Sequence, residues 1–284
     1  MSEIDKRIFV VGCSRSGTTL LQVLLSSHPD LTSFPETNFF WSAIGNRRKV
    51  LAKLGLPTGL ESKAIRHTID LLELDKQEHP VPRFFPTFSS AVNKYIHILD
   101  KQAVKEGKSM WLEKTPLHVC RIDFIEKYVD DPVFVHIARD GREVVASICD
   151  RAREYPDRFG WQRDLSYGID LWNRTVARSI ECMGREGHVF TTYDRIVRST
   201  EDEVKRLCSH LNISFYPEMT EGNDDAQEKV IPQNRPWIHR ARKKPEMRSK
   251  SKFESLFDNR DQNKITRKIN IKMFQEISKF ISSN

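Results

Sequence analysis

Short apolar runs alternate along the chain with longer stretches in which apolar residues recur every three or four positions. The short runs are typical of buried strands and predict strands at residues 7–12, 31–34, 109–112, 132–138 and 188–192. The recurrent apolar positions predict helices at residues 20–25, 61–76, 87–104, 116–129, 143–153, 165–185, 201–211 and 264–281, with a turn at 193–194. Because strands alternate with helices, we expect an α/β fold with a central, mostly parallel sheet flanked by helices.

Residues 38–108 interrupt this alternation with a helical insertion that shows no convincing central strand. A proline-rich break at residues 79–82 separates its two predicted helices. The insertion is rich in aromatic residues, which more often form core than a ligand pocket: Phe39, Phe40, Trp41, Phe84, Phe85, Phe88 and Tyr95. A helical insertion over the strand ends is also where an acceptor would be recognised. No internal repeat is evident, so we expect residues 1–284 to form a single domain.

The first predicted strand leads into a short polar loop that contains Gly12 and Gly17, and then into an apolar helix. Glycines let backbone N–H groups approach an anion, and the helix N-terminus adds partial positive charge at the same place. A phosphate-binding loop is therefore favoured over a turn without a ligand. A triphosphate loop needs lysine after the second glycine, where this chain has Thr18, and the cation has moved to Arg15. Such a loop suits a shorter, less charged phosphoanhydride.

Together with its flanks, this loop resembles the 5′-phosphosulfate loop of sulfotransferases, which use 3′-phosphoadenosine 5′-phosphosulfate (PAPS). The resemblance implies a three-layer, P-loop-like fold and transfer of a sulfuryl group to a hydroxyl or amine. The product of PAPS would be adenosine 3′,5′-bisphosphate (PAP). The resemblance also implies which residues of the loop and helix bind the nucleotide: Arg15, Ser16, Gly17, Thr18, Thr19 and Leu20.

Glu36 follows the short second strand, so it should face the loop at the carboxyl edge of a parallel sheet. Sulfuryl transfer needs a base for the acceptor's proton, and a placed carboxylate typically contributes ~10²–10⁴ in rate. The loop, residues 28–30 and the glutamate 21 residues after Arg15 resemble the tyrosylprotein and heparan-type sulfotransferases, which implies that Glu36 is the base. The alternative is a surface glutamate in a turn. Cytosolic small-molecule sulfotransferases use the histidine of Lys-Thr-His; this chain has Pro116 there, and His118 is a weaker substitute.

Lys114 also follows a predicted strand and should lie at the same edge of the sheet. Negative charge grows on the departing 5′-phosphate as the sulfur leaves it. Preplaced cations from Lys114 and Arg15 would stabilise that charge without a metal, and removing one such donor commonly costs ~3–4 kcal/mol. The neighbouring Glu113 is expected to be structural or an ion-pair partner, and a lysine at a strand end also occurs without a catalytic role.

Arg139 ends the fourth predicted strand, and Ser147 lies eight residues further, about two helical turns along the next helix. The run between them resembles the sulfotransferase signature that binds the 3′-phosphate, a group that ATP lacks. A guanidinium fork suits a phosphate, and a hydroxyl adds a hydrogen bond. The same resemblance implies nucleotide contacts by Tyr193, and places Ser249 and Lys252 near the phosphates.

The charge distribution adds a basic segment to this picture. The net charge is +7, and residues 235–252 hold eight basic residues against one acidic residue, so this segment carries the whole excess. It is either a solvated loop or a clamp over an anionic ligand, and we expect residues 229–261 to cap the cofactor. No nucleic-acid motif is present.

Composition also bears on the compartment and on metals. No apolar run approaches the ~20 residues of a membrane span. Five irregularly spaced cysteines without a CxxC pair argue against a zinc site and favour a reducing compartment, by default the cytoplasm.

The sequence therefore predicts a PAPS-dependent sulfotransferase that needs no metal. A small-molecule kinase would use the same sheet, but the loop lysine and an evident magnesium-binding aspartate are missing. A non-catalytic nucleotide-binding protein is a further alternative, against which Glu36 and Lys114 argue. Small molecules, glycans, lipids and peptides are all compatible acceptors, and the oligomeric state leaves no signal in the sequence.

Overall fold

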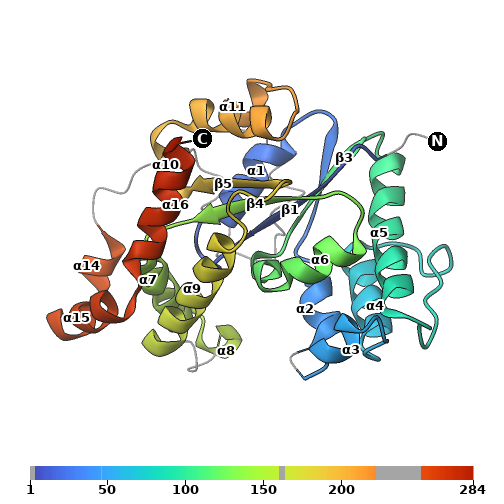
Figure 1. Ribbon diagram of the computed structural model, residues 1–284, viewed down its shortest axis with the longest axis horizontal. Coiled ribbons are helices and arrows are strands. Elements are labelled where there is room, and N and C mark those ends of the chain that lie inside the picture. Colours follow the sequence, from blue (N-terminus) through green and yellow to red (C-terminus); the bar gives the residue numbers. More distant parts are fainter. Residues whose placement is uncertain (1–3, 46, 160–163, 222–250, 284) are drawn as a thin grey trace.

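Five parallel strands form the centre of the protein. The computed structural model describes residues 4–45, 47–159, 164–221 and 251–283. Its strands are β1 (Lys6–Gly12), β2 (Leu31–Phe34), β3 (Met110–Lys114), β4 (Pro132–Ala138) and β5 (His188–Thr192), in the spatial order β2-β3-β1-β4-β5 (Figure 1). All four neighbouring pairs are parallel, which confirms the predicted sheet and brings the carboxyl ends of the strands to one edge.

Helices cover both faces of the sheet, so the fold has three layers (Figure 1). One face is covered by α1 (Thr18–Ser26), α10 (Tyr193–Arg198), α11 (Thr200–His210) and α12 (Glu218–Glu221). These helices pack on alternate strand residues such as Ile8, Val10 and Leu112, which are all fully buried. The alternation follows from the two-residue period of a strand, which sends successive side chains to opposite faces.

The opposite face carries the larger core, centred on Phe9, Trp111 and Phe134. It is covered by η1 (Pro116–Arg121), α6 (Ile122–Tyr128), α7 (Gly141–Glu154) and α9 (Leu165–Ile180), while the short α8 (Pro156–Phe159) follows α7. The three C-terminal helices are α14 (Lys252–Leu256), α15 (Asn259–Lys268) and α16 (Ile271–Ser283). None of the described helices is both long and apolar enough to cross a membrane.

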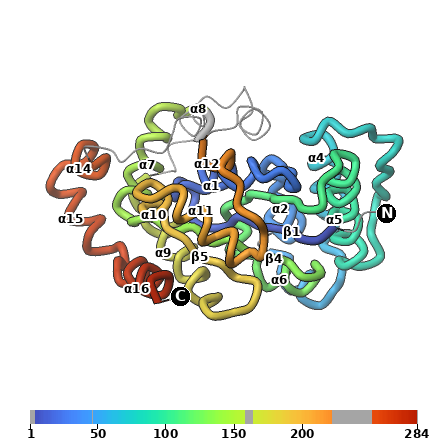
Figure 2. The backbone as a smooth tube through the Cα atoms, turned by 90° about the horizontal axis from the view of Figure 1, so that it is seen from above, coloured from blue at the N-terminus to red at the C-terminus, as the bar shows by residue number. Residues whose placement is uncertain are grey.

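The insertion between β2 and β3 contains α2 (Phe39–Ile44), α3 (Lys49–Lys53), α4 (Glu61–Leu71) and α5 (Phe88–Lys105), and its described residues form no strand. Most of its aromatic residues are core, as the sequence indicates: Phe39, Phe40, Phe85, Phe88 and Tyr95 are buried. Phe84 is exposed instead. The insertion lies at one end of the molecule, and α14 and α15 lie at the other (Figures 1 and 2).

Several predicted boundaries are wrong for identifiable reasons. Residues 193–198 form α10 rather than a turn, because the Thr192 side chain caps the helix by accepting a hydrogen bond from the Arg195 N–H. The single helix predicted at residues 264–281 is two helices. Asn173 holds the break between them: its side chain donates to the Lys268 carbonyl and accepts from the Asn270 N–H.

Strand β3 extends two residues beyond its predicted end, so that Glu113 and Lys114 belong to the strand. The strand continues because its neighbours keep pairing with it, Phe34 and Phe9 with Glu113 and Val10 with Lys114. Polar residues at these positions gave no sign of a buried strand in the sequence.

Candidate active site

The first loop is shaped to hold an anion. A Cβ at Gly12 would lie 2.4 Å from the Ile137 carbonyl oxygen, and one at Gly17 would lie 2.6 Å from the Tyr193 ring, so both positions need glycine. Gly17 precedes α1 in a left-handed conformation, and no side chain caps the helix. The Ser16 hydroxyl is buried and has no hydrogen-bond partner among the described residues. A buried hydroxyl beside an uncapped helix N-terminus fits a phosphate or sulfate group.

Arg15 connects this loop to α7. Its backbone adopts a positive φ of 76°, and its Nε donates a hydrogen bond of 3.1 Å to the Ser147 hydroxyl. Glu143, Ser147 and Asp150 are spaced four and three residues apart, so they share one face of α7. The structure therefore brings together two residues, from the loop and from α7, that were predicted to bind opposite ends of the nucleotide.

Arg139 and Tyr193 form the next part of the site. The Arg139 guanidinium lies 4.1 Å from the centre of the Tyr193 ring, a distance typical of a cation–π contact. One of its nitrogens is 3.5 Å from a Glu143 carboxylate oxygen. The buried Trp172 indole donates to the Arg139 carbonyl over 3.0 Å, which fixes the end of β4. Because the Tyr193 ring also borders Gly17, these side chains lie next to the anion loop.

The last two residues of the basic segment, Ser251 and Lys252, lie within the part of the chain that the structure describes, and they pack on α7. The Lys252 ammonium forms an ion pair with Asp150, and the Ser251 hydroxyl donates a 2.6 Å hydrogen bond to Glu143. Lys252 therefore lies against the same helix face as Ser147. Ser249 and most of residues 229–261 lie outside the described residues, so the capping role of this segment stays a prediction.

Glu36 and Lys114 meet at the carboxyl edge of the sheet. The Lys114 ammonium donates a hydrogen bond to Glu36 Oε1. The Lys114 side chain is 3% exposed, whereas that of Glu36 is 28% exposed. The residue predicted as base and the residue predicted as leaving-group cation are thus in contact, and the carboxylate is accessible to a second molecule.

A buried network beneath this pair was not foreseen in the sequence. Glu113 Oε1 accepts hydrogen bonds from the Thr37 N–H and hydroxyl, both at 3.0 Å, and from the Thr115 hydroxyl at 2.6 Å. Its other oxygen lies 3.1 Å from Nδ1 of His118. Burial alone would raise the pKa of Glu113, but His118 and the hydrogen bonds from Thr115 and Thr37 outweigh it, so the pKa is lowered.

This network bears on two residues considered in the sequence, His118 as a substitute base and Glu113 as a structural residue. His118 is fully buried against Glu113 and cannot meet an acceptor, which removes it as a substitute base. Glu113 is structural, as expected. Sequence reasoning missed Thr37, which joins the turn after Glu36 to Glu113, because nothing local marks a threonine that bonds 76 residues away.

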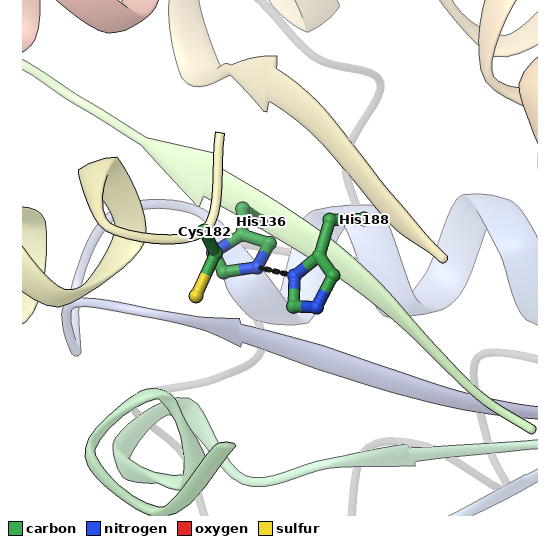
Figure 3. Close-up of side chains that lie close together, drawn as sticks. All are labelled: His136, Cys182 and His188. Carbon is green, nitrogen blue, oxygen red and sulfur yellow. Dashed lines mark hydrogen bonds between the residues drawn. The ribbon is translucent and has the colours of Figure 1, made fainter. Parts of the chain in front are cut away.

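A second group of ionisable side chains lies toward the amino end of β5 (Figure 3). His136, Cys182 and His188 each place a potential metal-ligating atom within 4.8 Å of the others. His136 Nε2 and His188 Nδ1 are 2.9 Å apart, and the remaining nitrogens lie 3.1 Å from the Ser179 hydroxyl and 2.9 Å from Glu126. Burial lowers the pKa of both histidines. Each imidazole nitrogen of His136 and His188 therefore has a hydrogen-bond partner within the protein. That the reaction needs no metal stays a prediction.

Known proteins share the fold of this chain and part of its sequence. The chain is 24% identical over 222 residues to a Caenorhabditis briggsae protein named "Putative protein-tyrosine sulfotransferase", covering 77% of this chain and 70% of that protein. Among solved structures, the sulfotransferase domain of an olefin synthase from Synechococcus PCC 7002 matches with a TM-score of 0.58, 18% identity and coverage of 94% and 95%. A mouse sulfotransferase complexed with PAP matches with a TM-score of 0.55, 11% identity and coverage of 100% and 91%. These similarities show a shared fold. The model of the sulfotransferase family matches residues 7–218, so this chain belongs to the sulfotransferase family.

Proposed function

We propose that this sulfotransferase moves the sulfuryl group of PAPS to an acceptor hydroxyl or amine, with Glu36 as base and Lys114 as the leaving-group cation. The observation that carries the proposal is the contact between Lys114 and the partly exposed Glu36 at the sheet edge. A carboxylate oxygen that accepts one hydrogen bond from lysine keeps further acceptor positions for a substrate proton.

The proposed transfer is in line. The acceptor oxygen or nitrogen attacks sulfur, the bond between sulfur and the bridging phosphate oxygen breaks, and the acceptor's proton passes to Glu36. The electron pair of the broken bond stays on the 5′-phosphate of PAP, where Lys114 stabilises the new negative charge. Arg15 is proposed to share this task.

The two ends of the nucleotide are proposed to bind two different elements. The loop and the start of α1 hold the 5′ end through Arg15, Ser16, Gly17, Thr18, Thr19 and Leu20. Arg139 and Ser147 hold the 3′-phosphate, with Tyr193, Ser249 and Lys252 as further contacts. The 3.1 Å hydrogen bond between Arg15 and Ser147 supports one continuous anion site that a bisphosphate nucleotide would span.

The acceptor and the compartment are also proposals. We propose a hydroxyl- or amine-bearing small molecule, glycan, lipid or peptide, and the similarity to a protein named for tyrosine sulfation makes peptide tyrosine a natural first acceptor to test. Five free cysteines, four of them buried, support a reducing compartment such as the cytoplasm. A kinase is not favoured, because Thr18 stands where the phosphate-binding lysine would be.

Calorimetry with matched nucleotides tests the assignment. Wild-type protein should bind PAP well, 5′-AMP much less tightly, and Mg-ATP weakly. Arg139→Ala should weaken PAP binding by at least ~tenfold, since a charge-assisted phosphate contact is lost, while 5′-AMP binding changes little.

Arg142→Ala is the matched control for this experiment, because Arg142 is exposed one turn away and pairs with Asp140. Binding of Mg-ATP with indifference to PAP would overturn the proposed function. Transfer of label from radiosulfate-labelled PAPS to peptide, glycan, lipid and phenol acceptors would then identify the acceptor class.

A further inference from the structure

Exposed apolar side chains gather in one short stretch of the insertion. The large hydrophobic residues that are exposed in the described part of the chain are Val50, Leu51, Leu54, Leu56 and Phe84. Four of these five fall within the seven residues 50–56, on α3 and the turn after it; we call these four the α3 patch. Val50 and Leu54 are each 68% exposed. A cluster of exposed apolar residues marks a surface that contacts something apolar.

The α3 patch is held rigidly rather than on a loose loop. Ala52, the fourth of the five residues of α3, is fully buried, and the Tyr128 hydroxyl donates a 2.6 Å hydrogen bond to its carbonyl. The Lys53 carbonyl accepts from the Lys127 ammonium at 2.7 Å, and the Gly55 carbonyl accepts from the Phe88 N–H at 2.9 Å. The body of the protein therefore fixes the backbone of this segment while the patch side chains stay outside.

Exposed basic residues flank the patch in the sequence. Arg47, Arg48, Lys49 and Lys53 lie in the same segment, and no acidic residue occurs between Arg47 and Leu60. The surroundings of Lys49 are cationic as well: burial and the nearby Arg121 lower its pKa. Arg121 is itself buried, with its guanidinium 4.4 Å from the centre of the Trp41 ring, so the exposed charge of this segment comes from Arg47, Arg48, Lys49 and Lys53. A partner that binds this surface must therefore present both negative charge and apolar groups.

We infer that the α3 patch docks on the surface of an anionic phospholipid bilayer. Lipid headgroups supply the negative charge for the arginines and lysines, and the boundary of the acyl chains accepts Val50, Leu54 and Leu56. A second copy of this chain fits less well, because it would bring an equal positive charge to the contact. The docking does not depend on which acceptor the enzyme sulfates.

Vesicle co-sedimentation tests this inference on the full chain. The protein should sediment with vesicles of phosphatidylcholine and phosphatidylserine, and much less with phosphatidylcholine alone or at high salt. The double variant Val50→Ser/Leu54→Ser and the double variant Lys49→Glu/Lys53→Glu should each weaken binding by roughly tenfold or more. Lys264→Glu/Arg267→Glu on α15 has the same change in net charge at the other end of the molecule (Figure 1), and it should bind like wild type.

Unchanged PAP binding and thermal unfolding would show that each variant is folded. Two results would overturn the inference. One is vesicle binding that ignores phosphatidylserine or survives both α3 double variants. The other is self-association in sedimentation velocity that Val50→Ser/Leu54→Ser abolishes, which would assign the patch to a second copy.

Discussion

Two glutamates at the ends of neighbouring strands have opposite environments. Glu36 lies two residues beyond β2, is 28% exposed on its side chain and contacts the Lys114 ammonium. Glu113 lies within β3, is fully buried, and receives hydrogen bonds from Thr37 and Thr115 beside a contact with His118. One carboxylate is open to a substrate and the other is enclosed by the protein, so environment decides which of two identical side chains can act as a base.

The buried Glu113 also helps to position the partly exposed Glu36. Glu113 bonds the backbone N–H of Thr37, the residue after Glu36, and it precedes Lys114 in the chain. The Thr37 hydroxyl bonds the buried Tyr95 hydroxyl over 2.9 Å, which ties the same turn to α5. Both members of the proposed catalytic pair are therefore held through neighbours that a single buried carboxylate fixes.

The largest effect is expected from Glu36→Gln, which removes the proposed base and keeps the shape of the side chain. Turnover should fall by ~10²–10⁴, because general-base catalysis is lost. PAP affinity should stay near wild type, since the nucleotide loop is untouched, and the melting temperature should fall, because the buried Lys114 ammonium loses its counter-charge while glutamine can still accept its hydrogen bond. Single-turnover transfer from PAPS, calorimetry and thermal unfolding measure the three quantities. Unchanged turnover would remove Glu36 as the base.

The same comparison shows what the sequence could predict. Glu36, Lys114, Arg139 and the glycine loop lie at strand ends, and each sits inside a short motif that resembles sulfotransferases. Local sequence was sufficient to place these residues near the sheet edge and to find all five strands, although β3 runs two residues past its predicted end. The network around Glu113 was not predictable, because its partner Thr37 comes from a turn 76 residues away.

The errors outside the site have the same origin. The end of α15 is fixed by Asn173 of α9, 95 residues distant from Lys268, so no local signal marked the break. Helix α3 was missed because its five residues, Lys49–Lys53, are too few to display a helical period, and its apolar Val50 and Leu51 are exposed. Local signals find the strands and the longer helices, and tertiary contacts decide where individual elements start and stop.

A smaller effect on turnover and a larger one on stability are expected from Glu113→Gln. The amide can accept fewer hydrogen bonds than the carboxylate and leaves donors of Thr37, Thr115 or His118 unpaired, so the free energy of unfolding should fall by ~1–3 kcal/mol. The Glu36 turn loosens, and turnover should drop by roughly tenfold with PAP affinity unchanged. Chemical denaturation and initial rates measure both.

His118→Asn separates positioning from simple loss of stability. It removes one contact of Glu113 but keeps the hydrogen bonds to Thr37 and Thr115, so it should destabilise the fold with a smaller loss of turnover. Equal losses of turnover in the two variants, at equal stability, would contradict the positioning role of Glu113.

The smallest effect is a pH dependence of stability. The pKa of Glu113 in the folded protein is lowered from its usual value, because His118 and the hydrogen bonds from Thr115 and Thr37 outweigh the effect of burial. Above that value the carboxylate is ionised in both states and its full contribution to stability is present. As the pH falls below it, the unfolded chain takes up a proton that the folded protein resists, so stability is lost until the folded pKa is passed. One group contributes at most ~1.4 kcal/mol per pH unit.

Urea denaturation between pH 5 and 3 should therefore show a free energy of unfolding that depends less steeply on pH for Glu113→Gln than for wild type. An identical pH dependence in the two proteins would mean that the buried carboxylate is no better stabilised in the folded state than in water. Glu113 and Glu36 would then differ only in their exposure to solvent.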